Sequence, residues 1–176
     1  TVVNAMLGPI ISQYLDDLNT NLARNGVIRP IQVMQSGGGQ MSVAAAREKP
    51  AYIIESGPAA GVIAAATIAR KQKLDRVITL DMGGTTAKLG AVDDGIPAIT
   101  PTFEVDPIRY RPGSGLPINV PAIELLEIGA GGGSIARAEF GVIHIGPESA
   151  GADPGPICYG LGGQRATITD ANLVLG

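Results

Sequence analysis

The sequence contains few aromatic residues and almost no cysteine. Its 176 residues include no Trp, two Phe and four Tyr, so a hydrophobic core has to be built from Val, Ile, Leu and Ala. Cys158 and His144 are the single Cys and the single His. One Cys forms no internal disulfide, and one Cys with one His cannot supply the four ligands of a tetrahedral zinc site. This cysteine content fits a reducing cytoplasm.

Clustered basic residues and long apolar segments are also missing. The net charge is −3 and no stretch concentrates Lys or Arg, which argues against a nucleic-acid partner. No apolar run approaches the ~20 residues of a membrane span, and no signal peptide is visible. We therefore expect a cytoplasmic protein with no membrane partner. Because the chain starts at Thr1 within an amphipathic pattern, we also expect it to be part of a longer protein.

Glycine is abundant, with 25 residues gathered in short clusters that are typical of binding loops built from backbone. Apolar spacing and turn signals predict helices over 3–22 and 57–71, strands over 31–35, 52–54, 76–81, 85–92 and 122–127, and a hairpin over 134–145. Residues 97–121 are expected to form irregular β structure and 146–163 a loop, and Thr169 or Asp170 is expected to cap a C-terminal helix. This order of elements predicts an α/β fold.

The segment 80–88, LDMGGTTAK, carries the most chemical information. Asp81 ends a buried-type strand, and Gly83, Gly84 and then Thr85–Thr86 follow it. Glycines permit a tight turn and let backbone N–H groups approach an anion, and the two hydroxyls can donate to phosphate oxygens. Asp81 repels phosphate unless a cation or a water lies between them. It is therefore predicted to hold Mg²⁺ through water or to orient an attacking water.

A plain β-hairpin with an acidic residue before its turn is the alternative for this segment. In that alternative, Asp81 would be buried after four largely apolar residues with no partner to offset the cost of burying its charge. A Walker A loop is excluded, because Lys88 stands where that motif requires its second glycine. We expect Lys88 to be a solvated or structural lysine rather than a phosphate ligand.

A second glycine cluster follows another acidic strand end. Glu127 ends a predicted strand, and Gly131, Gly132 and Gly133 come shortly after it. Backbone amides in this cluster could face a nucleotide or a second substrate, or the cluster could be a structural turn, and the residue types leave both open. A Rossmann fingerprint is not met, because its last glycine position is occupied by Ser134.

Other candidates have a simpler structural explanation beside the functional one. Ser36–Gly39 and Ser56–Gly57 follow short predicted strands and could line a cleft, although the second pair is more often the start of a helix. Glu148 and Asp153 could bind a metal or a substrate from a Pro/Gly-rich loop, which is more often a solvated surface. His144 lies among apolar residues and is expected to be a strand residue rather than a base.

Asp81–Thr86 resembles the phosphate-binding hairpin of the ATPase superfamily that contains actin, sugar kinases and heat-shock chaperones. Within that superfamily the chain resembles the hydantoinase A/oxoprolinase family. The supporting segments, in the order of the family, are VMQSGGG (33–39), ESGPAAGV (55–62), DMGGTTAK (81–88), EIGAGGGSI (127–135), GPESAGADPGP (146–156) and TDAN (169–172). Together they span nearly the whole chain.

The resemblance implies a lobe of an actin-like, ribonuclease H-like fold, with a mixed sheet, flanking helices and an added irregular β region. Residues 1–75 would form its helical, inter-lobe part, and residues 76–176 the lobe of the phosphate hairpin, truncated at its C-terminus. The implied cofactors are ATP and Mg²⁺. The implied site residues are Asp81 and Glu127 as catalytic groups, Asp81 also as metal ligand, and Gly83, Gly84, Thr85, Thr86, Gly131, Gly132 and Gly133 as nucleotide-binding groups.

The activity implied by the resemblance is ATP-dependent opening of a cyclic amide, such as a hydantoin or 5-oxoproline. Phosphorylation of the amide oxygen would create a better leaving group for attack by water. Members of the family carry another phosphate hairpin in an N-terminal lobe, which this chain does not match, and work with a hydantoinase B-like subunit or domain. We therefore expect this chain alone to be inactive. The alternatives are a subunit of an ATP-dependent ketone carboxylase and a non-enzymatic, nucleotide-gated binding or activator module.

Overall fold

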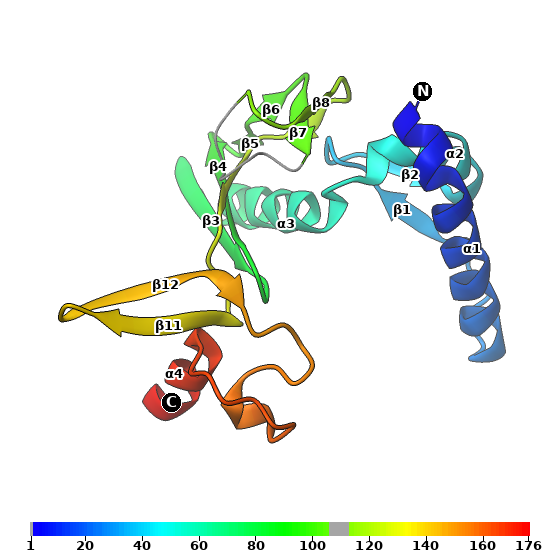
Figure 1. Ribbon diagram of the computed structural model, residues 1–176. Coiled ribbons are helices and arrows are strands. Elements are labelled where there is room, and N and C mark those ends of the chain that lie inside the picture. Colours follow the sequence, from blue (N-terminus) through cyan, green and yellow to red (C-terminus); the bar gives the residue numbers. More distant parts are fainter. Residues whose placement is uncertain (1, 106–112) are drawn as a thin grey trace.

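The computed structural model describes residues 2–105 and 113–176 (Figure 1). The helical elements are α1 (Val2–Arg24), α2 (Val43–Glu48), η1 (Pro50–Ile53), α3 (Ser56–Gln72), η3 (Ile157–Tyr159) and α4 (Ile168–Leu175), where η denotes a 3-10 turn. The strands are β1 (Gln32–Met34), β2 (Gln40–Ser42), β3 (Arg76–Met82), β4 (Ala87–Asp93), β5 (Ile96–Pro97), β6 (Ile99–Thr100), β7 (Phe103–Val105), β8 (Leu116–Ile118), β9 (Ala122–Ile123), β10 (Leu125–Ile128), β11 (Ser134–Glu139) and β12 (Val142–Ser149).

The long helix α1 lies at one end of the molecule and packs against α2 and η1 (Figure 1). The side-chain oxygen of Asn4 in α1 accepts a hydrogen bond of 2.8 Å from the N–H of Ala51, which ties the helix to η1. α1 ends where Gly26 takes a left-handed conformation, with φ +81°. Glycine adopts that conformation without a Cβ penalty, so it ends the helix as the sequence predicts.

The central sheet has the strand order β10-β4-β3, and β5 pairs with the end of β4. α3 packs across one of its faces (Figure 1). This face of the helix buries mostly small residues, namely Ala59, Val62, Ala66 and Ala69. Gly90 of β4 permits the close approach, because a Cβ there would lie 2.5 Å from the Val62 side chain. α3 therefore fixes the position of β3 and β4 by direct contact.

The opposite face of the central sheet is open in the described part of the chain. Ile78, Leu80 and Leu126 point to this face, and their side chains are 77%, 64% and 67% exposed. Residues one position along on the same strands, such as Val77 and Leu125, pack against the core under α3. The alternation along each strand thus separates a packed layer from an uncovered one.

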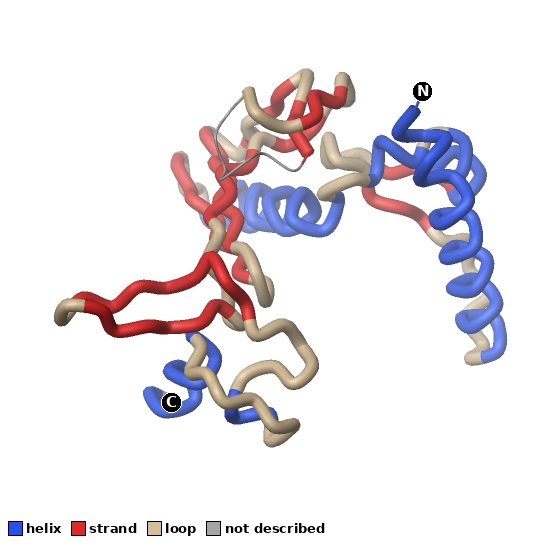
Figure 2. Tube along the Cα trace, in the orientation of Figure 1, coloured by secondary structure: helices blue, strands red, loops and turns tan. Residues whose placement is uncertain are grey.

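The described residues 96–105 and 113–123 form the irregular β region above the sheet, in which β6 pairs with β9 and β7 pairs with β8. A small core of Ala51, Ile118 and Val120 joins this region to η1. At the other end of the molecule, β11 and β12 form an extended hairpin, and a loop with one helical turn leads from it to α4 (Figure 2). Among the described residues, no helix is long and apolar enough to cross a membrane.

The α/β fold class expected from the sequence is confirmed, with helices beside a sheet and an added irregular β region. The pairings between described strands are all antiparallel, where we expected a mixed sheet. For β3 and β4 the reason is the short turn between them, which leaves no room for a crossover. Residues 106–112 of the predicted irregular β region lie outside the described residues. The division into 1–75 and 76–176 stays a prediction.

Three local predictions were wrong. The predicted strand at 52–54 is instead the end of the 3-10 turn η1 and the residue that follows it, because a short apolar run does not distinguish a strand from a helical turn. β12 continues to Ser149, into the predicted loop. The cap of α4 is Thr167, whose hydroxyl accepts from the N–H of Asp170 while the Asp170 carboxylate accepts from the N–H of Thr167. Thr169 and Asp170 therefore lie inside the helix.

Candidate functional site

The turn between β3 and β4 presents the candidate phosphate-binding groups at the surface. Asp81, Gly83, Gly84 and Thr85 are all exposed. Asp81 lies directly opposite Lys88 in the antiparallel ladder, and the N–H of Gly83 donates to the carbonyl of Thr86 at 2.9 Å to close the turn. Asp81 is therefore not buried in a packed interior, and its exposure removes the burial cost that the sequence raised against a plain β-hairpin. The residue is accessible to a cation or to water.

The loop Gly131–Gly133 packs against the back of this turn through backbone hydrogen bonds. The N–H of Gly132 donates to the carbonyl of Gly83 at 2.9 Å, and the N–H of Gly133 donates to the carbonyl of Gly84 at 2.7 Å. The N–H of Gly131 donates to the hydroxyl of Ser134, which is fully buried. The structure thus brings together two glycine clusters that lie almost fifty residues apart.

The contact between the two clusters leaves no space for side chains. A Cβ on Gly131 would lie 2.7 Å from the carbonyl oxygen of Gly83, and a Cβ on Gly133 would lie 2.9 Å from that of Gly84. These neighbours are backbone atoms, which cannot move aside as the end of a side chain can. A direct contact between Gly131–Gly133 and a nucleotide stays a prediction, and the amides expected to make that contact are hydrogen-bonded within the protein.

The same hydrogen bonds orient the free amides of the turn. In a trans peptide the C=O and N–H groups point in opposite directions. The carbonyls of Gly83 and Gly84 point to the loop Gly131–Gly133, so the N–H groups of Gly84 and Thr85 point away from it. Among the described residues, no hydrogen bond uses these two N–H groups. Two adjacent, exposed and unpaired N–H groups are the geometry of a backbone anion site.

A row of charged side chains crosses the sheet beside the turn. Asp81, Lys88 and Glu127 are neighbours on β3, β4 and β10 and share the face that α3 covers. Asp81 and Lys88 line a cleft of about 400 Å³ between α3 and the sheet. Since adjacent strands lie ~4.8 Å apart, Asp81 and Glu127 are about 10 Å from each other, with Lys88 between them.

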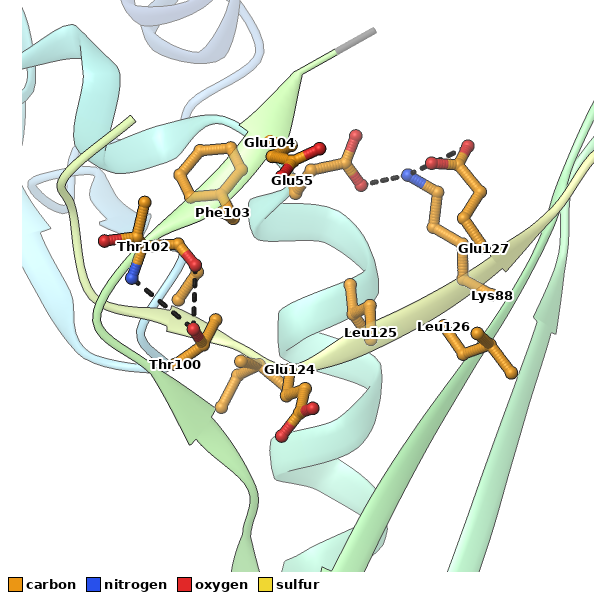
Figure 3. A pocket seen from close by; sticks show the side chains of 12 residues that line it. Glu55, Lys88, Thr100, Thr102, Phe103, Glu104, Glu124, Leu125, Leu126 and Glu127 are labelled. Atoms are coloured by element: carbon orange, nitrogen blue, oxygen red, sulfur yellow. Dashed lines mark hydrogen bonds and ion pairs between the residues drawn. The ribbon is translucent and has the colours of Figure 1, made fainter. Parts of the chain in front are cut away.

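Lys88 is held by carboxylates rather than exposed as a phosphate ligand. Its side chain is 14% exposed, its ammonium forms an ion pair with Glu55, and the carboxylate of Glu127 lies 3.8 Å away (Figure 3). Glu55, Lys88 and Glu127 line a second cleft, of about 310 Å³, that opens toward the irregular β region. This arrangement agrees with the expected structural role of Lys88.

Glu55 is a site residue that sequence reasoning missed. It precedes α3 in a left-handed conformation with φ 61°, and no side-chain cap closes the helix there. α3 begins at Ser56, which agrees with the expectation that Ser56–Gly57 starts a helix. A non-glycine residue in a left-handed conformation is strained. Such strained residues are found mostly at functional positions. No local pattern in the sequence announces the ion pair with Lys88, 33 positions further on.

The beginning of α4 supports the glycine loop from behind. Asp170 accepts hydrogen bonds from the N–H groups of Cys158, Ile157 and Thr167 and from the Thr167 hydroxyl. Desolvation would raise the pKa of Asp170, but the hydrogen bonds from Cys158 and Thr167 outweigh it and hold the pKa far below its usual range. Thr169, the residue before Asp170 in α4, donates hydrogen bonds from both its N–H and its hydroxyl to the carbonyl of Gly132.

The remaining sequence candidates occupy structural positions. Ser36 is buried, and its hydroxyl lies within hydrogen-bond distance of the carbonyls of Tyr52 and Ile54. Glu148 lies on β12, and an ion pair and hydrogen bond with Arg165 lower its pKa. Among the described residues, no group of three Asp, Glu, His or Cys side chains is arranged to hold a metal.

The single His and the single Cys also lie away from the turn. His144 is an exposed residue of β12, as expected for a strand position. Cys158 is exposed, yet desolvation, reinforced by the hydrogen bond with Asp170, raises the pKa of its thiol. A thiol with a raised pKa is mostly protonated at neutral pH and is a poor nucleophile.

Comparison with known proteins connects this geometry to a family. The chain is 47% identical to an uncharacterized protein of Methanocaldococcus jannaschii and 41% identical to the caprolactamase subunit alpha of Pseudomonas jessenii. Both matches cover 100% of this chain, and they cover 27% and 24% of those proteins. The chain therefore spans about a quarter of the length of these two relatives.

A solved structure supports the same assignment. The nucleotide-free structure of acetone carboxylase, solved in work on ATP-dependent acetone carboxylation, matches 94% of this chain and 22% of its own with a TM-score of 0.73 and 28% identity. In addition, residues 1–176 match the family described as Hydantoinase/oxoprolinase over their full length. The chain belongs to the hydantoinase/oxoprolinase family.

Proposed function

We propose that the protein containing this chain hydrolyses a cyclic amide, such as a hydantoin, 5-oxoproline or a larger lactam, in a reaction that consumes ATP. The chain contributes part of the nucleotide site, and the rest comes from an N-terminal lobe of the same protein. A second, hydantoinase B-like subunit or domain completes the enzyme. Membership in the hydantoinase/oxoprolinase family and the similarity to a caprolactamase subunit support this proposal.

The observation that carries the proposal is the pair of free amides at the turn. The N–H groups of Gly84 and Thr85 are exposed and directed to one side, where they can donate to phosphate oxygens of ATP. The hydroxyls of Thr85 and Thr86 add further donors beside them. Because the glycine loop already holds the turn, these groups need no rearrangement when the anion binds, which is the condition for electrostatic stabilisation of a transferring phosphoryl group.

Asp81, on β3 just before the turn, supplies a carboxylate near these donors. Mg²⁺ in nucleotide sites is commonly held by one or two carboxylates together with phosphates and water, so one exposed Asp fits such an ion. When bound, MgATP would supply a phosphoryl group to the amide oxygen and make the amide carbon more electrophilic. Water would then add to that carbon, the ring C–N bond would break with the nitrogen leaving as an amine, and hydrolysis of the resulting acyl phosphate would release phosphate. Glu127 is proposed as a second acidic group, about 10 Å from Asp81, that orients the water or the amide.

The test measures phosphate release by the intact protein, assembled with its partner subunit. Hydantoin, 5-oxoproline and caprolactam are each added with MgATP, and ring opening is followed in parallel. We expect one of these amides to stimulate ATP hydrolysis and D81N to reduce the stimulated rate by a factor of about 100 or more, as for other groups that position a phosphoryl transfer. D93N, at the other end of the same β-hairpin, is the matched control and should retain the wild-type rate.

The proposal fails if no cyclic amide stimulates ATP hydrolysis or if D81N and D93N behave alike. The chain without the rest of the protein is expected to open no ring. Ring opening by the chain alone would contradict the proposal that the nucleotide site is shared with an N-terminal lobe.

A ketone carboxylase subunit is the second candidate, favoured by the match to acetone carboxylase. ATP hydrolysis stimulated by acetone and bicarbonate, and by no amide, would select it.

A further inference from the structure

Thr169, on the first turn of α4, makes two hydrogen bonds to one carbonyl of the glycine loop. Its N–H and its hydroxyl each donate to the carbonyl oxygen of Gly132 at 2.8 Å. The fit is close, because a Cβ on Gly132 would lie 2.8 Å from the Thr169 hydroxyl. A residue distant in sequence from the phosphate turn thus holds the loop on which that turn rests.

The peptide group between Gly132 and Gly133 links this contact to the turn between β3 and β4. Its carbonyl accepts both hydrogen bonds from Thr169, and its N–H donates to the carbonyl of Gly84 at 2.7 Å. Donors on the carbonyl of a peptide polarise it and strengthen the hydrogen bond that its N–H makes. The Gly84 carbonyl belongs in turn to the peptide whose N–H, on Thr85, is free. The contacts form a continuous relay from α4 to a candidate phosphate donor.

The Thr169 hydroxyl has no other structural task among the described residues. The helix is capped by Thr167, with Asp170 closing the capping box, so the cap does not need Thr169. Asp170 also accepts hydrogen bonds from Ile157 and Cys158 and thereby fixes the start of α4 to the preceding turn η3. The helix is therefore a firm support, and its one hydroxyl directed to the glycine loop is that of Thr169.

We propose that Thr169 is a positioning residue of the nucleotide site, which acts through Gly132 and Gly133 to hold the Thr85 N–H in its phosphate-binding direction. This role rests on the proposed function of the Asp81–Thr86 turn. Loss of the hydroxyl leaves α4 and the turn folded but lets the turn rotate. Binding of MgATP then weakens, because part of its binding free energy is spent on ordering the turn.

The experiment compares T169V, T169S and T67V in the intact protein. T169V keeps the shape and the N–H and loses only the hydroxyl donor, whereas T169S keeps the hydroxyl. T67V is the matched control, because the Thr67 hydroxyl also donates to a backbone carbonyl, that of Ile63 in α3. We expect T169V to raise the dissociation constant for MgATP about three- to tenfold, as for a lost hydrogen bond. T169S and T67V should stay within about twofold of the wild type.

Two further measurements distinguish positioning from stability and from the proposed function itself. The melting temperature of T169V should match that of T67V, and amide exchange in the peptide covering 82–88 should be faster in T169V without nucleotide. Equal MgATP binding by wild type and T169V, with binding lost in D81N, overturns the positioning role and leaves the proposed function intact. A lower melting temperature with unchanged MgATP binding likewise assigns Thr169 to stability alone. Absence of MgATP binding by the wild type overturns the proposed function and this role with it.

Discussion

Two β-hairpins of similar construction have opposite surroundings. The hairpin β3–β4 turns through Gly83 and Gly84, whose carbonyls are held by the loop Gly131–Gly133, and α3 covers one of its faces. The hairpin β11–β12 turns through Phe140 and Gly141, where the Phe140 side chain is fully exposed and a Cβ on Gly141 would meet no atom within 4 Å. The first turn is held by the loop Gly131–Gly133, whereas among the described residues no hydrogen bond from outside the hairpin reaches Phe140 or Gly141.

The difference shows why the first turn is the better candidate for a binding site. Residues held only by local preferences move among conformations, and binding has to overcome that loss of entropy. The turn of β3–β4 presents two unpaired N–H groups whose direction is already determined by hydrogen bonds on their carbonyls. An acidic residue before a Gly-Gly turn is therefore informative only together with the loop that supports it.

The largest effect is expected from placing a methyl group between the turn and its support. G131A brings a Cβ to 2.7 Å from the backbone of Gly83 and Gly84, so the loop has to separate from the turn. We expect a cost of about 2–3 kcal/mol in the local opening free energy, measured by native-state amide exchange at 82–88, and at least roughly tenfold weaker MgATP binding.

Its control is the equivalent change in the free hairpin. G141A meets no neighbouring atom but forces an alanine to φ +80°, which costs about 1 kcal/mol within β11–β12 and should leave MgATP binding unchanged. If G131A and G141A have the same effect on nucleotide binding, the support from the glycine loop has no functional meaning and the comparison fails.

A smaller effect is expected from the ion pairs that accompany the two hairpins. Lys88 in β4 is 14% exposed and pairs with Glu55, whereas Arg165, which pairs with Glu148 of β12, is 55% exposed. K88M should cost about 1–2 kcal/mol in local stability, because it leaves Glu55 and Glu127 near each other without a counter-charge. R165M should cost less than K88M, because water screens an exposed pair. Amide exchange in β4 and β12 measures the two costs. Equal costs would show that the difference in exposure between the two ion pairs does not affect their contribution to stability.

The turn itself was predictable from local sequence, and its support was not. A strand ending in Asp81, a Gly-Gly turn and a returning strand follow from alternation and from glycine's conformational freedom over a few residues. The contact of Thr169 with Gly132 spans 37 positions, and that of Glu55 with Lys88 spans 33. No periodicity within one element encodes such contacts, because they depend on how the elements pack.

The cap of α4 is a different kind of miss. The sequence contains the capping-box pattern of Thr167 followed three residues later by Asp170, so the correct cap was available from spacing alone. The presence of another threonine, Thr169, next to Asp170 favoured the wrong position. Because Thr167 caps the helix, the Thr169 hydroxyl is available for a contact outside the helix. The proposed role of Thr169 depends on that contact.

Acid should weaken the support of the first hairpin through one identified group. The pKa of Asp170 is held far below its usual range in the folded protein, so its stabilising hydrogen bonds are present in full above the ordinary pKa of about 4 and are lost as pH falls below it. We expect the opening free energy of the α4 amides, corrected for intrinsic exchange, to fall below pH 4 in the wild type. D170N should lower it at neutral pH and remove most of the acid dependence.

The matched change on the other hairpin is E148Q. The pKa of Glu148 is also lowered, by Arg165, so its contribution has the same sign of pH dependence but belongs to β12. E148Q should therefore leave the acid dependence of the α4 amides as in the wild type. An unaltered acid dependence in D170N would assign the loss of stability to another group and contradict the role of Asp170 as the anchor of α4.

The smallest effect is expected at the tip of the free hairpin. Phe140 and Gly141 form a two-residue turn between Glu139 and Val142, with φ angles of 51° and 80°. Positive φ at both positions is the conformation in which Asn-Gly is preferred and a phenylalanine is strained. F140N should stabilise β11–β12 by about 0.5 kcal/mol in amide exchange and leave MgATP binding unchanged, because this turn lies at the opposite end of the hairpin from Ser134, where β11 meets the glycine loop. Loss of stability, or of assembly with the proposed partner subunit, would instead show that Phe140 is buried in the intact protein and that the second hairpin is also held from outside.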